Sequence, residues 1–170
     1  KELKRNPPTP FITSTLQQEA AKRLGFSSKK TMFIAQRLYE NGHITYMRTD
    51  SVNLSQDALT TTKNWIEKTL GPKYSSQAPR VFQTKSKIAQ EAHEAIRPTI
   101  VENLPENLDG DDSEKNLYKL IWQRFVASQM PQAIFDSTAI NVQAGKYFLN
   151  FGITWIGSRV ISKMKRGKIF

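Results

Sequence analysis

The chain is organised around one short polar segment, which reads His43-Ile44-Thr45-Tyr46-Met47-Arg48-Thr49-Asp50-Ser51. Hydroxyl, guanidinium and carboxylate groups are crowded into it. Two helices are predicted before the segment and a third after it, so the segment crosses a mainly helical body that we expect over residues 13–131. It is therefore the first place to look for chemistry.

Apolar residues at helical spacing, bounded by capping residues and by glycine or proline, predict the helices of this body. The expected helices run from Thr13 or Ser14 to Gly25, from Ser27 or Ser28 to Gly42, from Ser55 to Gly71, over residues 89–96, and from Asp112 or Ser113 to Ser128. The apolar stripe of the second helix is predicted to hold Met32, Ala35, Leu38 and Tyr39. The later stripes place Trp65, Trp122 and Phe125 in the core rather than against nucleic-acid bases.

The character of the sequence changes near Gln132. Residues 134–142 and 147–156 are rich in β-branched and aromatic side chains, which predicts two strands, and residues 160–170 can form a further one. The polar, proline-containing start is expected to be extended. The predicted fold class is therefore α+β, with divisions at residues 1–12, 13–131 and 132–170.

An excess of positive charge is the strongest bulk property of the chain. Lys and Arg number 25 against 15 Asp and Glu, so the net charge is +10 and the pI is about 9.9. This excess of positive charge attracts polyanions and favours nucleic acid as the partner. The alternative is that the charge only keeps the protein soluble. A membrane is disfavoured, because no apolar run reaches the roughly 18 residues of a spanning helix. The absence of cysteine fits a cytoplasmic protein.

Tyr46 is a candidate nucleophile. A tyrosine hydroxyl has a pKa of about 10, so it attacks well only where a cation or a base favours the phenolate. If the segment is extended, Arg48 lies on the same side as Tyr46 and places a guanidinium beside an attacked phosphate. Spacing alone nevertheless favours an ordinary half-buried strand tyrosine.

A second group of candidates lies in Gln90-Glu91-Ala92-His93-Glu94-Ala95-Ile96-Arg97-Pro98. His93 and Arg97 are four residues apart and share a face if this stretch is helical, where they could grip a phosphodiester. The spacing matches no metal-binding motif, and no metal ligands are predicted in this chain. Spacing alone favours a surface helix with Glu and Arg pairs.

Two stretches together resemble the type IA DNA topoisomerases. One covers about residues 8–56 and leads into Ile44-Thr45-Tyr46-Met47-Arg48-Thr49-Asp50-Ser51; the other is Ala89-Gln90-Glu91-Ala92-His93-Glu94-Ala95-Ile96-Arg97-Pro98-Thr99. Both are specific, whereas residues 71–87 and 146–170 match weakly. Met47 resembles the bacterial topoisomerase I branch, because the topoisomerase III branch usually has proline there.

The resemblance implies a mechanism. Tyr46 would attack one strand of single-stranded or underwound DNA and form a 5′-phosphotyrosine bond, after which strand passage and religation relax negative supercoils without ATP. Arg48 would hold the scissile phosphate and stabilise its charge in the transition state. His93 would contact DNA near the cut, and Arg97 would bind DNA or support that region.

The resemblance also implies parts that this chain lacks. In the family, an N-terminal Toprim domain binds Mg²⁺ and completes the site, and a β-rich arch domain flanks the helical one. Residues 1–12 and 132–170 would be pieces of that arch. We therefore expect a fragment of a bacterial cytoplasmic enzyme of the nucleoid, which alone binds DNA but does not relax it.

Two rival functions remain at this point. A non-catalytic DNA-binding module could keep the fold without the activity, and an upstream Toprim segment in the full gene product would argue against it. A tyrosine recombinase also uses a tyrosine nucleophile, but it should surround that tyrosine with several arginines and histidines in a pattern absent here.

Overall fold

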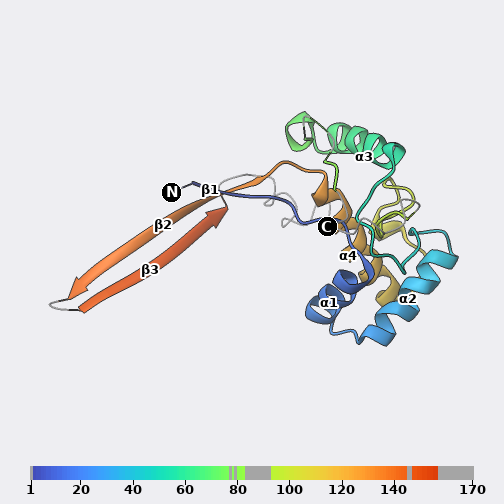
Figure 1. Cartoon of the computed structure of the whole chain (residues 1–170), viewed down its shortest axis with the longest axis horizontal. Helices are drawn as coiled ribbons and strands as arrows, with labels where there is room; N and C mark the ends of the chain where they lie inside the picture. The colour runs from blue at the N-terminus through green and yellow to red at the C-terminus, as the bar shows by residue number, and fades with distance from the viewer. Residues whose placement is uncertain (1, 77, 79, 83–92, 145–146, 157–170) are drawn as a thin grey trace. The chain divides into compact units, whose positions relative to one another are not determined.

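The computed structural model describes residues 2–76, 78, 80–82, 93–144 and 147–156, which form two compact units, one of residues 8–130 and one of residues 1–7 with 131–170 (Figure 1). The helical unit contains α1 (Thr13–Leu24), α2 (Ser28–Glu40), α3 (Gln56–Thr69) and α4 (Asp112–Ser128), with the short 3-10 turns η1 (Pro72–Tyr74) and η2 (Pro105–Asn107). The strand unit contains β1 (Glu2–Arg5), β2 (Ala133–Ala144) and β3 (Tyr147–Ile156). The α+β fold class is confirmed.

The core of the helical unit is built on α4. Its buried face includes Leu117, Ile121 and Phe125, as the spacing predicts, together with Trp122. Helices α1 and α2 pack on α4. Helix α3 reaches it through Trp65, whose ring stands edge-on to that of Trp122 with 5.1 Å between the centroids. Burying each large apolar side chain is worth about 1.5–3 kcal/mol, so α4 anchors the other helices.

Side-chain caps explain where α2 and α3 begin. Ser27 accepts a hydrogen bond from the N–H of Lys30 at 3.2 Å, and Ser55 accepts one from the N–H of Ala58 at 3.4 Å. Helix α1 ends at Gly25, whose φ of 67° is the left-handed conformation that favours glycine. These three boundaries are confirmed.

The predicted cap of α1 is wrong. The helix begins after Ile12 rather than at a cap formed by Thr13 or Ser14. The hydroxyl of Thr15 accepts a hydrogen bond from the N–H of Ile12 at 3.0 Å. Thr13 does not cap the helix because its hydroxyl is bonded to a distant segment, which outweighs the local preference.

The start of α4 differs from the prediction by one or two residues. Its cap is Asp111 rather than Asp112 or Ser113, because Asp111 and Glu114 form a reciprocal pair in which each carboxylate accepts from the other's N–H at 2.9 Å. Arg37 of α2 lies 3.1 Å from the Glu114 carboxylate and ties the two helices together.

The helix predicted over residues 89–96 is wrong in its described part, residues 93–96, and residues 89–92 lie outside the described residues. Ile96 instead forms an antiparallel bridge with Phe11, to whose carbonyl its N–H donates at 2.8 Å. Pairing with distant segments satisfies the N–H groups that a helix would bond locally. Tertiary contacts thus override the helix propensity of Ala and Glu.

In the strand unit, β2 pairs antiparallel with both β1 and β3. The strands predicted over residues 134–142 and 147–156 are confirmed, whereas the one considered over residues 160–170 lies outside the described residues. The register pairs Glu2 with Asp136, so the first residues of the chain join the strand that follows α4. The assignment of these strands to an arch domain stays a prediction.

Candidate functional site

Tyr46 lies in an irregular loop between α2 and α3, not in the strand that spacing alone favours. Burial alternates along this loop. Met47 and Thr49 are buried, whereas Arg48 is exposed and the side chain of Tyr46 is 40% exposed. Two buried residues therefore anchor a loop that leaves the candidate nucleophile and the candidate phosphate-binding cation accessible.

An aromatic contact supports the ring of Tyr46. The ring of Tyr39 stands edge-on to it, with 5.3 Å between the centroids and 68° between the planes. Tyr39 is 41% exposed, so its predicted place on the buried stripe of α2 is wrong. The buried face of α2 is formed instead by Thr31, Ile34, Ala35 and Leu38. An edge-on aromatic pair contributes about 0.5–1.5 kcal/mol and limits how the rings turn.

The first residue of α1 holds the loop on the C-terminal side of Tyr46. The hydroxyl of Thr13 donates to the carbonyl of Met47 at 2.8 Å and accepts from the N–H of Thr49 at 2.9 Å. The N–H of Thr13 also donates to the carbonyl of Thr49 at 2.9 Å. These bonds hold both neighbours of Arg48, so the backbone that presents its guanidinium is fixed to α1.

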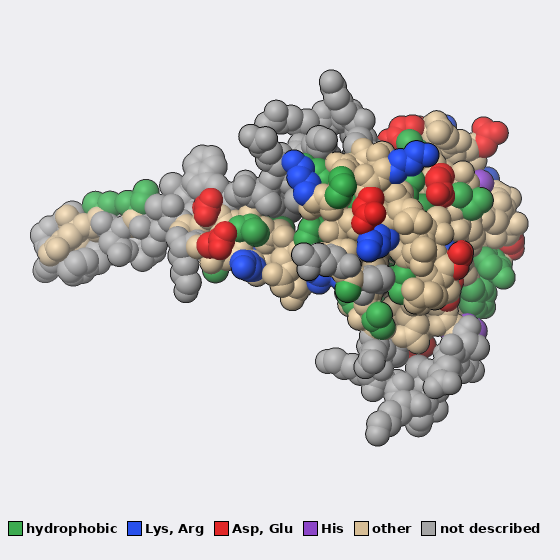
Figure 2. All heavy atoms as spheres, turned by 90° about the horizontal axis from the view of Figure 1, so that it is seen from above, with side chains coloured by type: hydrophobic (Ala, Val, Ile, Leu, Met, Phe, Trp, Pro, Cys, Tyr) green, Lys and Arg blue, Asp and Glu red, His purple; other side chains and the backbone are tan. Residues whose placement is uncertain are grey.

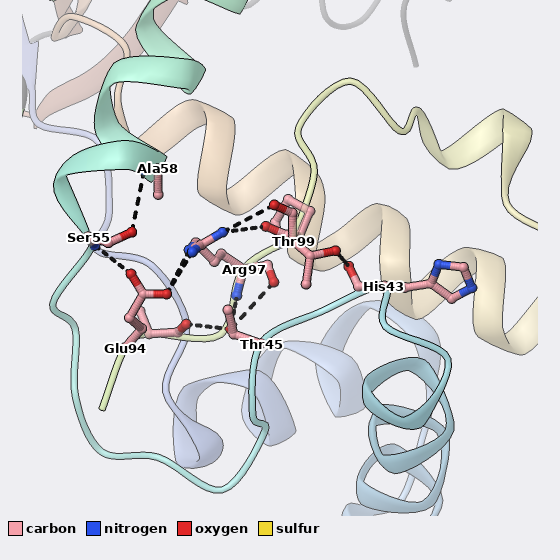
Figure 3. A network of polar contacts seen from close by, with 9 residues as sticks. His43, Thr45, Ser55, Ala58, Glu94, Arg97 and Thr99 are labelled. Carbon is pink, nitrogen blue, oxygen red and sulfur yellow. Dashed lines mark hydrogen bonds and ion pairs between the residues drawn. The ribbon is translucent and has the colours of Figure 1, made fainter. Parts of the chain in front are cut away.

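A second set of bonds holds the loop on the N-terminal side of Tyr46 (Figure 3). The hydroxyl of Thr45 donates to the carbonyl of Ala95 at 2.7 Å and accepts from the N–H of Arg97 at 3.0 Å. Further along, the N–H of Thr99 donates to the carbonyl of His43 at 3.0 Å. Residues 42–45 and 95–99 thus run antiparallel, and the neighbour of Tyr46 is bonded to the segment that follows His93.

A hollow of about 430 Å³ brings several of the candidates together. Arg48, Asp50 and His93 line it, with Ser14 and Gln17 from the first turns of α1. The first turn of α1 carries no acidic residue. Because a helix N-terminus carries a partial positive charge, the hollow combines that charge with a guanidinium and an imidazole, groups that can bind a phosphate, and with the Asp50 carboxylate, which repels one. Tyr46 is not among the described residues that line it.

Arg97 and Glu94 form a partly buried ion pair beside this site. The guanidinium of Arg97 lies 2.6 Å from the carboxylate of Glu94 and donates to the carbonyl of Pro98 at 2.9 Å. Burial raises the pKa of the Glu94 carboxyl, but the hydrogen bond from Ser55 and the charge of Arg97 lower it by more, so that pKa lies below its ordinary value of 4.5. The shared helical face predicted for Arg97 and His93 is absent, since residues 93–97 are not helical.

Sequence reasoning placed Tyr46, Arg48 and His93 as candidates but missed the residues that hold them. Thr13, Thr45 and Glu94 bond to groups between 34 and 52 residues away in the sequence. Partners so far apart leave no periodic pattern in one sequence. The dense polar character around Tyr46 was the only local sign that such a network could form there.

Figure 2 shows Lys and Arg side chains beside Asp and Glu side chains over one face of the helical unit. Among the described residues, no group of three or more His, Asp or Glu side chains is arranged to hold a metal ion. None of the helices that the structure describes has both the length and the apolar character to cross a bilayer.

A family model of DNA topoisomerases matches residues 1–159. DNA topoisomerase 1 of Haemophilus influenzae is 54% identical over 150 residues, which cover 88% of this chain and 17% of that protein. DNA topoisomerase 1 of Pasteurella multocida is 58% identical over 141 residues, covering 82% of this chain and 16% of that protein. The chain therefore spans only 16–17% of the length of these relatives.

A solved structure of full-length topoisomerase I from Thermotoga maritima shares the fold. Its TM-score with this chain is 0.81 at 38% identity. The match covers 99% of this chain and 28% of that one.

Proposed function

Since this chain belongs to the bacterial type IA DNA topoisomerases, we propose that Tyr46 is the nucleophile that cuts one DNA strand. The observation that carries this proposal is the arrangement around Tyr46. Its ring is accessible, and both flanking backbone segments are bonded to distant elements through Thr13 and Thr45. A nucleophile held in this way needs little further ordering before it attacks, which is how positioning lowers a barrier.

In the proposed reaction, the hydroxyl oxygen of Tyr46 bonds to a backbone phosphorus and its proton leaves to a base. The bond between that phosphorus and the neighbouring 3′ oxygen breaks, and the 3′ oxygen takes up a proton. Religation is the reverse attack by the 3′ hydroxyl. One phosphoester bond replaces another, so the bond energy needed for religation is kept in the phosphotyrosine and no ATP is required.

Arg48 and His93 are proposed to bind the DNA beside the cut. The Arg48 guanidinium can donate two parallel hydrogen bonds to phosphate oxygens and stabilise the charge that builds on them. His93 lines the same hollow, so it can reach the same strand. Arg97, predicted as a DNA contact, is proposed to act mainly by holding its own segment, because its guanidinium donates to Glu94 and to the carbonyl of Pro98.

The remaining parts of the activity are proposed to lie in a longer polypeptide. Magnesium chemistry would be supplied by a Toprim domain, since the described residues of this chain offer no metal-binding group. Strand passage and relaxation of negative supercoils, in the bacterial cytoplasm, would need that domain and the rest of the arch. We propose that this chain alone binds single-stranded DNA without relaxing plasmid.

The test is whether a covalent protein–DNA adduct forms. The longer polypeptide, mixed with a single-stranded oligonucleotide labelled on the side that keeps the 5′ phosphate, should give a labelled protein band, and Tyr46→Phe should abolish it. An adduct that survives in Tyr46→Phe would reject Tyr46 as nucleophile. If no adduct forms in the unsubstituted protein either, while DNA binding is retained, the non-catalytic DNA-binding module becomes the better function.

A further inference from the structure

We propose that Glu94 is a positioning residue for strand cleavage, because one carboxylate joins Arg97 to the start of α3 and thereby fixes the His93 segment against the Tyr46 loop. This inference rests on the proposed function of Tyr46. Glu94 itself touches neither DNA nor the reacting atoms in this proposal.

The two carboxylate oxygens of Glu94 have separate partners (Figure 3). Oε1 accepts a hydrogen bond from the backbone N–H of Ser55 at 2.5 Å. Oε2 accepts from Nη2 of Arg97 at 2.6 Å and from its Nε at 3.2 Å. The Glu94 side chain is 28% exposed and that of Arg97 is 14% exposed, so the pair is only partly screened by water. Both oxygens therefore accept hydrogen bonds from protein groups.

The bond to Ser55 completes the cap of α3. In a capping box, the third residue of the helix is Glu or Gln, and its side chain accepts from the N–H of the cap residue. That position in α3 is Ala58, which has no acceptor. Glu94, 39 residues further along the chain, supplies the missing acceptor. The beginning of α3 and the segment after His93 are thereby joined through one side chain.

The bond to Arg97 extends the connection to the Tyr46 loop. The backbone of Arg97 makes two hydrogen bonds with Thr45, one from its N–H to the Thr45 hydroxyl at 3.0 Å and one from the Thr45 N–H to its carbonyl at 2.9 Å. Thr45 directly precedes Tyr46, and His93 directly precedes Glu94. The ion pair therefore links His93, which lines the hollow, to the residue that precedes Tyr46.

Removing Glu94 breaks this connection at two points. The N–H of Ser55 loses its acceptor, and the partly buried cation of Arg97 loses its counter-charge, which is destabilising in a poorly hydrated setting. The Arg97 guanidinium then keeps its bonds to the carbonyls of Pro98 and Thr99 but is no longer tied to the start of α3, so residues 93 and 94 can shift relative to Thr45. A shift of about 1 Å between groups that act together can cost about 100-fold in rate.

The experiment uses the longer polypeptide and measures two quantities separately, the affinity for a single-stranded oligonucleotide and the rate of adduct formation at saturating DNA. Glu94→Ala should lower the rate about 10- to 100-fold and leave the affinity within about twofold. Glu94→Gln keeps an acceptor for the N–H of Ser55 but loses the negative charge, so it should lower the rate of adduct formation by less than Glu94→Ala does. Glu106→Ala, which removes an exposed carboxylate on η2, is the matched control and should behave like the unsubstituted protein.

A second arm separates positioning from general stability. If Glu94 acts through His93, then Glu94→Ala should cost much less in a His93→Ala background than in the unsubstituted background. Equal losses in both backgrounds, an unchanged rate in Glu94→Ala, or a loss found only in affinity would each overturn the proposal. If Glu94→Ala does not fold, the test rests on Glu94→Gln, and an unchanged rate of adduct formation in that variant overturns the proposal. An adduct that survives in Tyr46→Phe would instead reject the proposed function, whatever the Glu94 variants show.

Discussion

Thr13 and Met47 are 34 residues apart in the sequence, yet the hydroxyl of Thr13 donates to the carbonyl oxygen of Met47 at 2.8 Å. The same hydroxyl accepts from the N–H of Thr49 at 2.9 Å. One side chain at the start of α1 therefore carries the bonds that position the backbone on both sides of Arg48.

Replacing Thr13 should destabilise the helical unit. Thr13→Val keeps the shape but removes the hydroxyl, so the N–H of Thr49 loses its side-chain acceptor inside the protein, at a cost of about 1–3 kcal/mol. Thermal unfolding should show a lower midpoint for Thr13→Val, while Thr13→Ser should stay close to the unsubstituted protein. Equal midpoints for the two variants would mean that this hydroxyl contributes nothing.

Arg48 should matter for its geometry as well as for its charge. If its guanidinium binds the attacked phosphate through two bonds, Arg48→Lys should lose much of the cleavage rate although the charge is kept. Arg48→Ala should lose about 100- to 1,000-fold, the usual loss when a group that stabilises transition-state charge is removed. The measurement is the rate of adduct formation at saturating oligonucleotide. A lysine variant with the full rate would limit Arg48 to general attraction of DNA.

The contact between Tyr39 and Tyr46 should orient the nucleophile. Tyr39→Phe keeps an aromatic ring and should retain the adduct rate, whereas Tyr39→Ala should lose between about 2- and 10-fold, the effect of an aromatic pair worth 0.5–1.5 kcal/mol. Phe33→Ala is the control, because Phe33 is on the same helix and is 63% exposed. If Phe33→Ala and Tyr39→Ala behave alike, the loss reflects α2 in general and not this contact.

The ion pair of Glu94 should make stability depend on pH at the acid end. The pKa of Glu94 in the folded protein lies below 4.5, because the hydrogen bond from Ser55 and the charge of Arg97 outweigh burial. Its contribution is thus complete above pH 4.5 and is lost as the pH falls from there through the lower folded pKa. Denaturant unfolding at a series of pH values should show a shallower acid loss in Glu94→Gln. Parallel curves for the two proteins would contradict this.

Much of the fold could be predicted because its signals are local. The spacing of Leu117, Ile121 and Phe125 indicates one buried face of α4, and Ser27 and Ser55 cap their helices through neighbouring N–H groups. The prediction failed where a local preference met a stronger distant contact. Residues 93–96 have helix-forming side chains, yet Ile96 bonds to Phe11.

The sequence by itself determined the family and the candidates Tyr46, Arg48 and His93, because these lie within runs of residues that are characteristic of type IA topoisomerases. Only the tertiary structure decided which residues hold them. Glu94 reaches Ser55, and Arg97 reaches Thr45, across 39 and 52 residues of chain. Such bonds form only where the folded backbone brings a donor and an acceptor together. The spacing of residues in a single sequence does not show which distant residues will meet.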